Sequence, residues 1–186
     1  MNNKSVKGSM ISGNPAKELI IFAIPMILGN LFQQFYNIAD SVIVGKFLGP
    51  DALAAVGASN SITTLFVMVA IGTGIGCSVI ISQLFGAGRM KDVKSSISTA
   101  LIAIFAFSLI LSTIGFMLSG NILKWMHTPS DVYEEADKYL KIYFLGFAFL
   151  FMYNAFNAVF NALGDSAKPL VFLIFSSVLN IGLDIL

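Results

Sequence analysis

Hydrophobic residues dominate five long segments of the chain, and short polar, glycine- or proline-containing stretches separate them. The segments cover residues 16–46, 52–85, 93–118, 135–163 and 169–186. A helix needs about 20 mainly apolar residues to cross a bilayer, and the first four segments reach that length. The pattern predicts an all-α fold, a polytopic bundle of about five transmembrane helices.

The stretch before the first helix, residues 1–15, is polar and has no cleavable signal pattern. If it is a cytoplasmic tail, the segments on that side hold seven Lys and Arg residues and the other side holds four. The positive-inside rule therefore predicts a cytoplasmic N-terminus in a multi-pass protein of the plasma or inner membrane. Because the last apolar run reaches Leu186 without a turn or a charged stop, we expect the chain to continue beyond it.

One proline interrupts the first segment. Pro25 has no backbone N–H and removes one helical hydrogen bond, so a kink is expected over residues 22–29. This makes Pro25 a candidate hinge.

The first segment also carries a polar face that ends in a carboxylate. Gln33, Tyr36, Asn37 and Asp40 are spaced i, i+3, i+4 and i+7, which places them on one side of a helix. With Gln34, the first three are candidates for lining a cavity. A carboxylate within a membrane is costly and usually marks an ion or substrate path. The alternative is that Asp40 only hydrogen-bonds two helices together.

Further polar positions recur in the last two segments. Asn154 and Asn157, followed by Asn161, form a stripe on the fourth, and Asn180 lies four residues before Asp184 on the fifth. Asparagines of this kind can also simply hydrogen-bond neighbouring helices, at about 1 kcal/mol each.

In the predicted orientation, Asp40 and Asp184 lie at similar depth in the outer halves of their helices. With Asn180 they are the predicted ion-coupling site, for Na⁺ or a proton. Two like charges in a low-dielectric site raise each other's proton affinity, so at least one should carry a proton or a metal ion.

Composition narrows the function classes. The chain is 56% hydrophobic and 11% charged, against about 25% charged in soluble domains. A net charge of +1 does not suit a nucleic-acid partner. With a single cysteine (Cys77) and a single histidine (His127), no nucleophilic triad or clustered metal site can be assembled. We therefore expect neither an enzyme nor a cofactor, apart from a coupling ion.

Several local motifs carry a family resemblance. They are Ile24–Leu28, Asp40–Gly45, Gly49–Gly57, Gln83–Gly88 and Asn161–Asp165. In order and spacing the chain resembles the N-terminal part of the multidrug and toxic compound extrusion (MATE) transporters. The resemblance implies a transporter of two six-helix lobes, of which this chain supplies the first five helices. The sixth helix and the second lobe are missing partners.

The resemblance also implies a function. MATE proteins export small cationic amphipathic drugs or toxins across the lipid bilayer in exchange for Na⁺ or H⁺. The family's acidic positions match Asp40 and Asp184, and its polar site neighbours match Tyr36, Asn154, Asn157 and Asn180. The expected function is a cation-coupled antiporter.

Two alternatives stay open. One is a lipid-linked oligosaccharide flippase of the wider superfamily, which would need basic residues around a pyrophosphate. No Lys or Arg occurs between Lys17 and Lys46, or between Lys46 and Arg89, and this argues against it. The other is a non-transporting membrane bundle, in which buried carboxylates would have no purpose.

Overall fold

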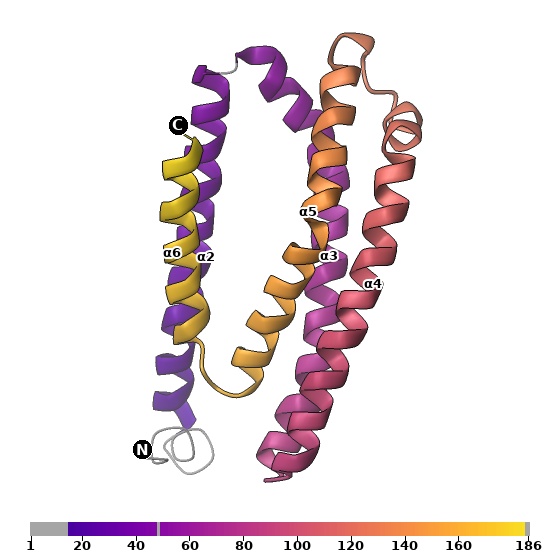
Figure 1. Ribbon diagram of the computed structural model, residues 1–186. Coiled ribbons are helices and arrows are strands. Elements are labelled where there is room, and N and C mark those ends of the chain that lie inside the picture. Colours follow the sequence, from indigo (N-terminus) through magenta and orange to yellow (C-terminus); the bar gives the residue numbers. More distant parts are fainter. Residues whose placement is uncertain (1–14, 48, 185–186) are drawn as a thin grey trace.

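The protein is a bundle of long helices joined by short turns (Figure 1). The computed structural model describes residues 15–47 and 49–184, so all of the predicted tail except Pro15 lies outside the described residues. The helices are α2 (Pro15–Phe47), α3 (Pro50–Gly86), α4 (Met90–Trp125), α5 (Ser130–Ala162) and α6 (Ala167–Asp184). No strand occurs in the described ranges, and the all-α prediction is confirmed.

Four of the described helices are long and apolar enough to cross a membrane: Ala16–Phe47, Leu53–Gly86, Met90–Trp125 and Ser130–Ala162. The apolar helix Ala167–Leu183 is shorter. Large apolar side chains such as Met117 and Phe149 lie exposed on the outside of the bundle, as expected of surfaces in contact with lipid.

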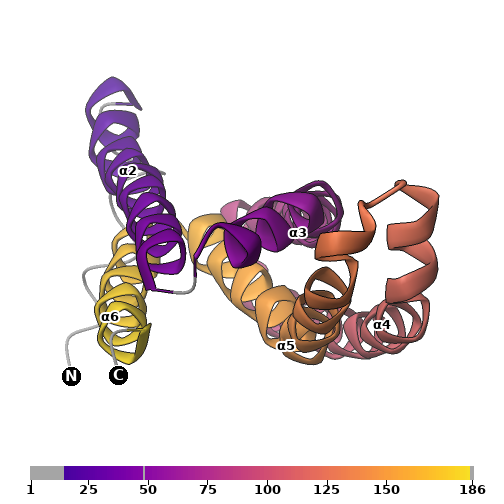
Figure 2. The ribbon, with the colours of Figure 1, turned by 90° about the horizontal axis from the view of Figure 1, so that it is seen from above.

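The helices fall into two groups (Figures 1 and 2). Helices α3, α4 and α5 pack closely together, and α2 pairs with α6 beside them, with few contacts between α5 and α6. The C-terminal half of α5 leans away from α4 toward α6 (Figure 1). This lean turns the second half of α5 toward the space between the two groups.

An aromatic core holds the three-helix group together. Phe144, Phe147 and Phe151 of α5 are fully buried, and Phe66 of α3 meets the first two edge-to-face, with ring centroids 5.0 and 5.3 Å apart. A Cβ at Gly115 of α4 would lie 2.3 Å from the Phe144 ring, so only glycine fits at this crossing. Close packing around small residues is how membrane helices associate.

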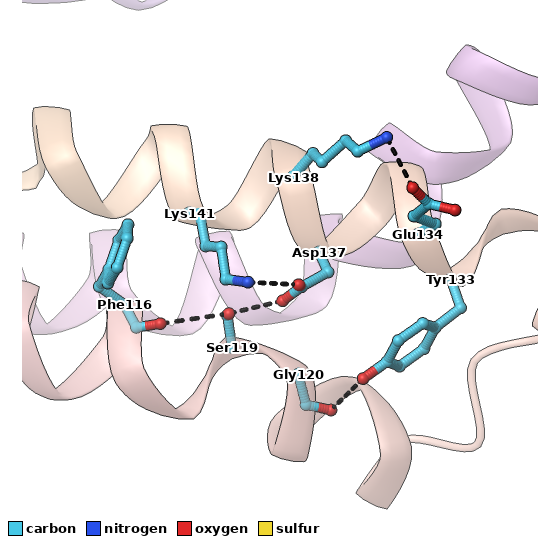
Figure 3. Close-up of polar contacts among 8 residues, drawn as sticks. All are labelled: Phe116, Ser119, Gly120, Tyr133, Glu134, Asp137, Lys138 and Lys141. Atoms are coloured by element: carbon cyan, nitrogen blue, oxygen red, sulfur yellow. Dashed lines mark hydrogen bonds and ion pairs between the residues drawn. The ribbon is translucent and has the colours of Figure 1, made fainter.

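A polar network fixes the start of α5 against the end of α4 (Figure 3). The buried Ser119 hydroxyl donates to one carboxylate oxygen of Asp137 (2.6 Å), and the Lys141 ammonium donates to the other (2.7 Å). Tyr133 adds a bond from its hydroxyl to the Gly120 carbonyl at 3.0 Å. These contacts require the last turns of α4, which continues to Trp125, past the expected end at residue 118.

Candidate functional site

A cavity of about 920 Å³ separates the α2–α6 pair from α3 and α5. Eight amide side chains line it: Asn30, Gln33, Asn37, Asn60, Asn154, Asn157, Asn161 and Asn180. Two tyrosines, Tyr36 and Tyr153, and several apolar side chains complete the wall, and none of the described lining residues carries a formal charge. The cavity is therefore rich in hydrogen-bonding groups and electrically neutral along its walls.

The predicted polar face of α2 forms part of this wall. Gln33, Tyr36 and Asn37 line the cavity, whereas Gln34 is exposed and lies outside the lining. One residue further along a helix turns the side chain by about 100°, which takes Gln34 off the face that holds Gln33.

Asp40 follows the same face one turn later but is not among the lining residues. It is half-buried, and its charge acts on the hydroxyl of Tyr139 on α5. Asp40 therefore faces the protein interior near the first turns of α5, rather than lipid.

The proline-bearing turn of α2 closes another part of the cavity. Pro25 lines it, and α2 is helical on both sides of this residue, so the predicted bend stays a prediction. The buried Ser166 in the α5–α6 turn also lines the cavity and donates from its hydroxyl to the Phe22 carbonyl at 2.8 Å. Near a helical proline, side-chain hydroxyls commonly satisfy backbone groups in this way.

The asparagine stripe of α5 faces the cavity along its whole length. The amide NH₂ of Asn154 donates to the Leu150 carbonyl, and that of Asn161 donates to the side-chain oxygen of Asn157, both at 2.9 Å. The side-chain oxygen of Asn161 is buried and has no hydrogen-bond partner among the described residues.

Helix α6 brings the remaining predicted residues to the site. Asn180 lines the cavity, and its side-chain oxygen is also buried without a partner in the described part of the chain. Asp184 is the last residue of α6, and its side chain lies outside the described residues. Because α2 and α6 run side by side in the same direction, α6 ends beside the second half of α2, the part that carries Asp40 (Figure 1).

Several lining residues were not predicted as site residues. On α3, Asn60, Thr63 and Thr64 face the cavity with the i, i+3, i+4 spacing that revealed the polar face of α2. Asn161 lies four residues after Asn157 and shares its helix face. In both cases the periodic signal was present in the sequence.

The residues present suit a monovalent cation better than a clustered metal site. No group of three or more His, Cys, Asp or Glu side chains able to hold a metal ion occurs among the described residues. What the site offers instead is oxygen: the Asn180 amide oxygen and the Asp40 carboxylate. Carboxylate and carbonyl oxygens are the donors that hard cations prefer.

Comparisons with known proteins agree with this architecture. The MatE family model matches residues 25–186. The probable multidrug resistance proteins YpnP and YoeA of Bacillus subtilis are 36% and 33% identical over 90% of this chain, and 38% and 36% of their own lengths. A MOP superfamily transporter from Pyrococcus furiosus matches 99% of this chain and 40% of its own, with a TM-score of 0.89 and 26% identity. The chain thus spans about two fifths of these proteins.

Proposed function

Because the chain belongs to the MatE family of multidrug and toxic compound extrusion transporters, we propose that it is the first-lobe part of a cation-coupled drug exporter. In this proposal the whole protein exports small cationic amphipathic drugs or toxins in exchange for Na⁺ or H⁺. It lies in the cell membrane with its N-terminus in the cytoplasm. The second lobe, outside this sequence, forms the other wall of the transport path.

The observation that carries the proposal is the amide-lined cavity between the α2–α6 pair and the three-helix group. Its volume, about 920 Å³, lies within the range of sites that hold drug-sized ligands, about 300–1,000 Å³. Neutral amides both donate and accept hydrogen bonds, so they accommodate compounds of varied shape, as a multidrug exporter requires.

Asp40, Asn180 and Asp184 are the proposed ion-coupling residues. The parallel pairing of α2 and α6 favours their meeting at one end of the cavity. The buried oxygen of Asn180 supports a cation there, because a buried acceptor without a donor is costly unless an ion or a water satisfies it. Na⁺ would bind to these oxygens; alternatively, the two carboxylates would share a proton.

Coupling then follows from a shift of populations. Loading the site neutralises charge at the end of α2 and favours one arrangement of this helix, with Pro25 as the hinge. Such a change reshapes the cavity wall that Pro25 and Gln33 help to form.

The flippase alternative receives less support from this cavity. Holding a pyrophosphate requires cationic side chains, and the described lining residues include no Lys or Arg. Neutral amides fit an amphipathic drug better.

Transport by the full-length protein in membrane vesicles tests the proposal. A fluorescent cationic dye should move against its gradient when a Na⁺ or a pH gradient is imposed, each in a separate experiment. Dye movement that is independent of both gradients would exclude cation coupling, and a lack of any dye movement would exclude drug export.

A further inference from the structure

A second, smaller pocket lies between the leaning half of α5 and the start of α6. It has a volume of about 330 Å³ and is lined by Tyr153, Phe156, Asn157, Phe160, Pro169 and Phe172. Four of these six residues are aromatic. We call this space the side pocket.

The side pocket adjoins the central cavity. Tyr153, Asn157 and Pro169 line both spaces, so these three side chains form the boundary between them. Because α5 and α6 make few contacts with each other, little else closes the boundary. A molecule in the cavity therefore lies next to an aromatic pocket.

The polar group at the boundary is an amide pair. Asn157 accepts a hydrogen bond from the Asn161 amide NH₂ at 2.9 Å, which fixes the orientation of both side chains in the cavity wall. The oxygen of Asn161 is then left buried and without a donor among the described residues. It is an acceptor that a ligand N–H can satisfy, and a buried unsatisfied acceptor rewards such a ligand strongly.

Charge near the pocket is already balanced. The Lys168 ammonium lies 5.5 Å from the centroid of the Phe160 ring and pairs with the Asp165 carboxylate at 2.7 Å. The rings of Phe160 and Phe172, one from each helix, have centroids 6.5 Å apart and tilt by 36°. Selectivity in the pocket must therefore come from ring contacts and from the amide pair.

We propose that the side pocket and the Asn157–Asn161 amide pair form a second binding subsite, for planar aromatic compounds that carry an N–H donor. The flat ring system packs among the aromatic side chains, and its N–H group donates to Asn161. The subsite rests on the proposed export function and names the compounds that the exporter retains best. Its volume is at the lower end of the range for small-molecule sites, about 300–1,000 Å³.

A transported compound fits these features better than a membrane lipid does. A lipid acyl chain fills an aromatic pocket but brings no hydrogen-bond donor for the Asn161 oxygen. Continuity with the central cavity also places the pocket next to the transport path rather than on an isolated surface.

Binding of two cationic dyes to the purified full-length protein tests the subsite. Ethidium is planar and carries aromatic amines, whereas tetraphenylphosphonium is a bulky cation without any N–H. The variants are Asn161→Leu and Phe172→Ala. Their controls are Asn60→Leu, an amide of the same cavity on α3, and Phe175→Ala, an α6 phenylalanine outside the pocket. Phe172 and Phe175 are similarly exposed, 59% and 69%, so neither alanine variant should disturb folding.

We expect both variants to weaken ethidium binding about tenfold, and to change tetraphenylphosphonium binding less than about twofold. The controls should leave both affinities within about twofold. If Phe172→Ala and Phe175→Ala bind ethidium equally well, the pocket is a lipid contact and the subsite is wrong, while the export function stands. If the unmodified protein binds neither dye, the export function fails and the subsite fails with it.

Discussion

The Ser166 hydroxyl donates a hydrogen bond to the Phe22 carbonyl, across 144 residues of sequence, at a distance of 2.8 Å. The bond joins the α5–α6 turn to α2, one turn before Pro25. It also places two cavity-lining elements in a fixed relation, because Ser166 and Pro25 both line the cavity. The candidate hinge of α2 is thus held by the turn that delivers α6.

Replacing this hydroxyl should loosen the pairing of α2 with α6. We expect Ser166→Ala to lower the free energy of unfolding by about 0.5–1.5 kcal/mol, the usual net value of one such bond. Ser176→Ala is the matched control, because Ser176 bonds only to the Leu173 carbonyl of its own helix. Thermal unfolding of the detergent-solubilised protein measures both, and equal midpoints for the two variants would rule out the tethering role.

The crossing of α4 and α5 should tolerate no side chain at Gly115. Gly115→Ala puts a methyl group into the Phe144 ring, and we expect a loss of about 1–3 kcal/mol in stability. Gly146→Ala on α5 meets nothing within 4 Å and should stabilise its helix by up to about 1 kcal/mol. Opposite shifts of the two unfolding midpoints are therefore predicted. Equal shifts would mean that the core repacks freely around Phe144.

The network at the start of α5 should matter more than its neighbouring surface ion pair. Asp137, 19% exposed, satisfies both the buried Ser119 and Lys141, so Asp137→Ala should cost about 1–3 kcal/mol. Glu134, 82% exposed, pairs only with Lys138, and Glu134→Ala should change stability little. Chemical unfolding of the two variants in parallel checks this. A loss as large for Glu134→Ala as for Asp137→Ala would contradict it.

The α5–α6 turn should lose part of its stability in acid. Partial burial acts to raise the pKa of Asp165, but hydrogen bonds and charge from Lys168 outweigh it and hold this pKa below its ordinary value of 3.8. A lowered pKa contributes stability above pH 3.8, and that contribution is lost as the pH falls through the folded-state value. The unfolding midpoints of the unmodified protein and Asp165→Asn should therefore differ at pH 7 and converge at low pH. A difference that stays constant with pH would contradict this.

The sequence predicted what periodicity encodes. The polar face of α2 and the stripe of α5 follow from helical spacing, and the structure brings Gln33, Asn37, Asn154 and Asn157 into one cavity. Gln34 was included only because it adjoins Gln33, although it points about 100° away.

Contacts between distant segments could not be predicted in this way. Ser166 carries no local sign that it reaches Phe22, and Gly115 no sign that it faces Phe144, because both contacts depend on how the helices cross. The side pocket likewise arises from the lean of α5 toward α6 (Figure 1).

Dye export by Asp40→Asn in the full-length protein tests the central claim, coupling through the α2 carboxylate, most directly. The change keeps the size and hydrogen bonding of the side chain but removes its charge. Efflux of a fluorescent cationic dye is measured with Na⁺ and pH gradients imposed separately, with Ser96→Ala on α4 as the control and with matched protein levels in the membrane. We predict that Asp40→Asn abolishes gradient-driven export and that Ser96→Ala does not. Export by Asp40→Asn at the normal rate under both gradients would contradict the account.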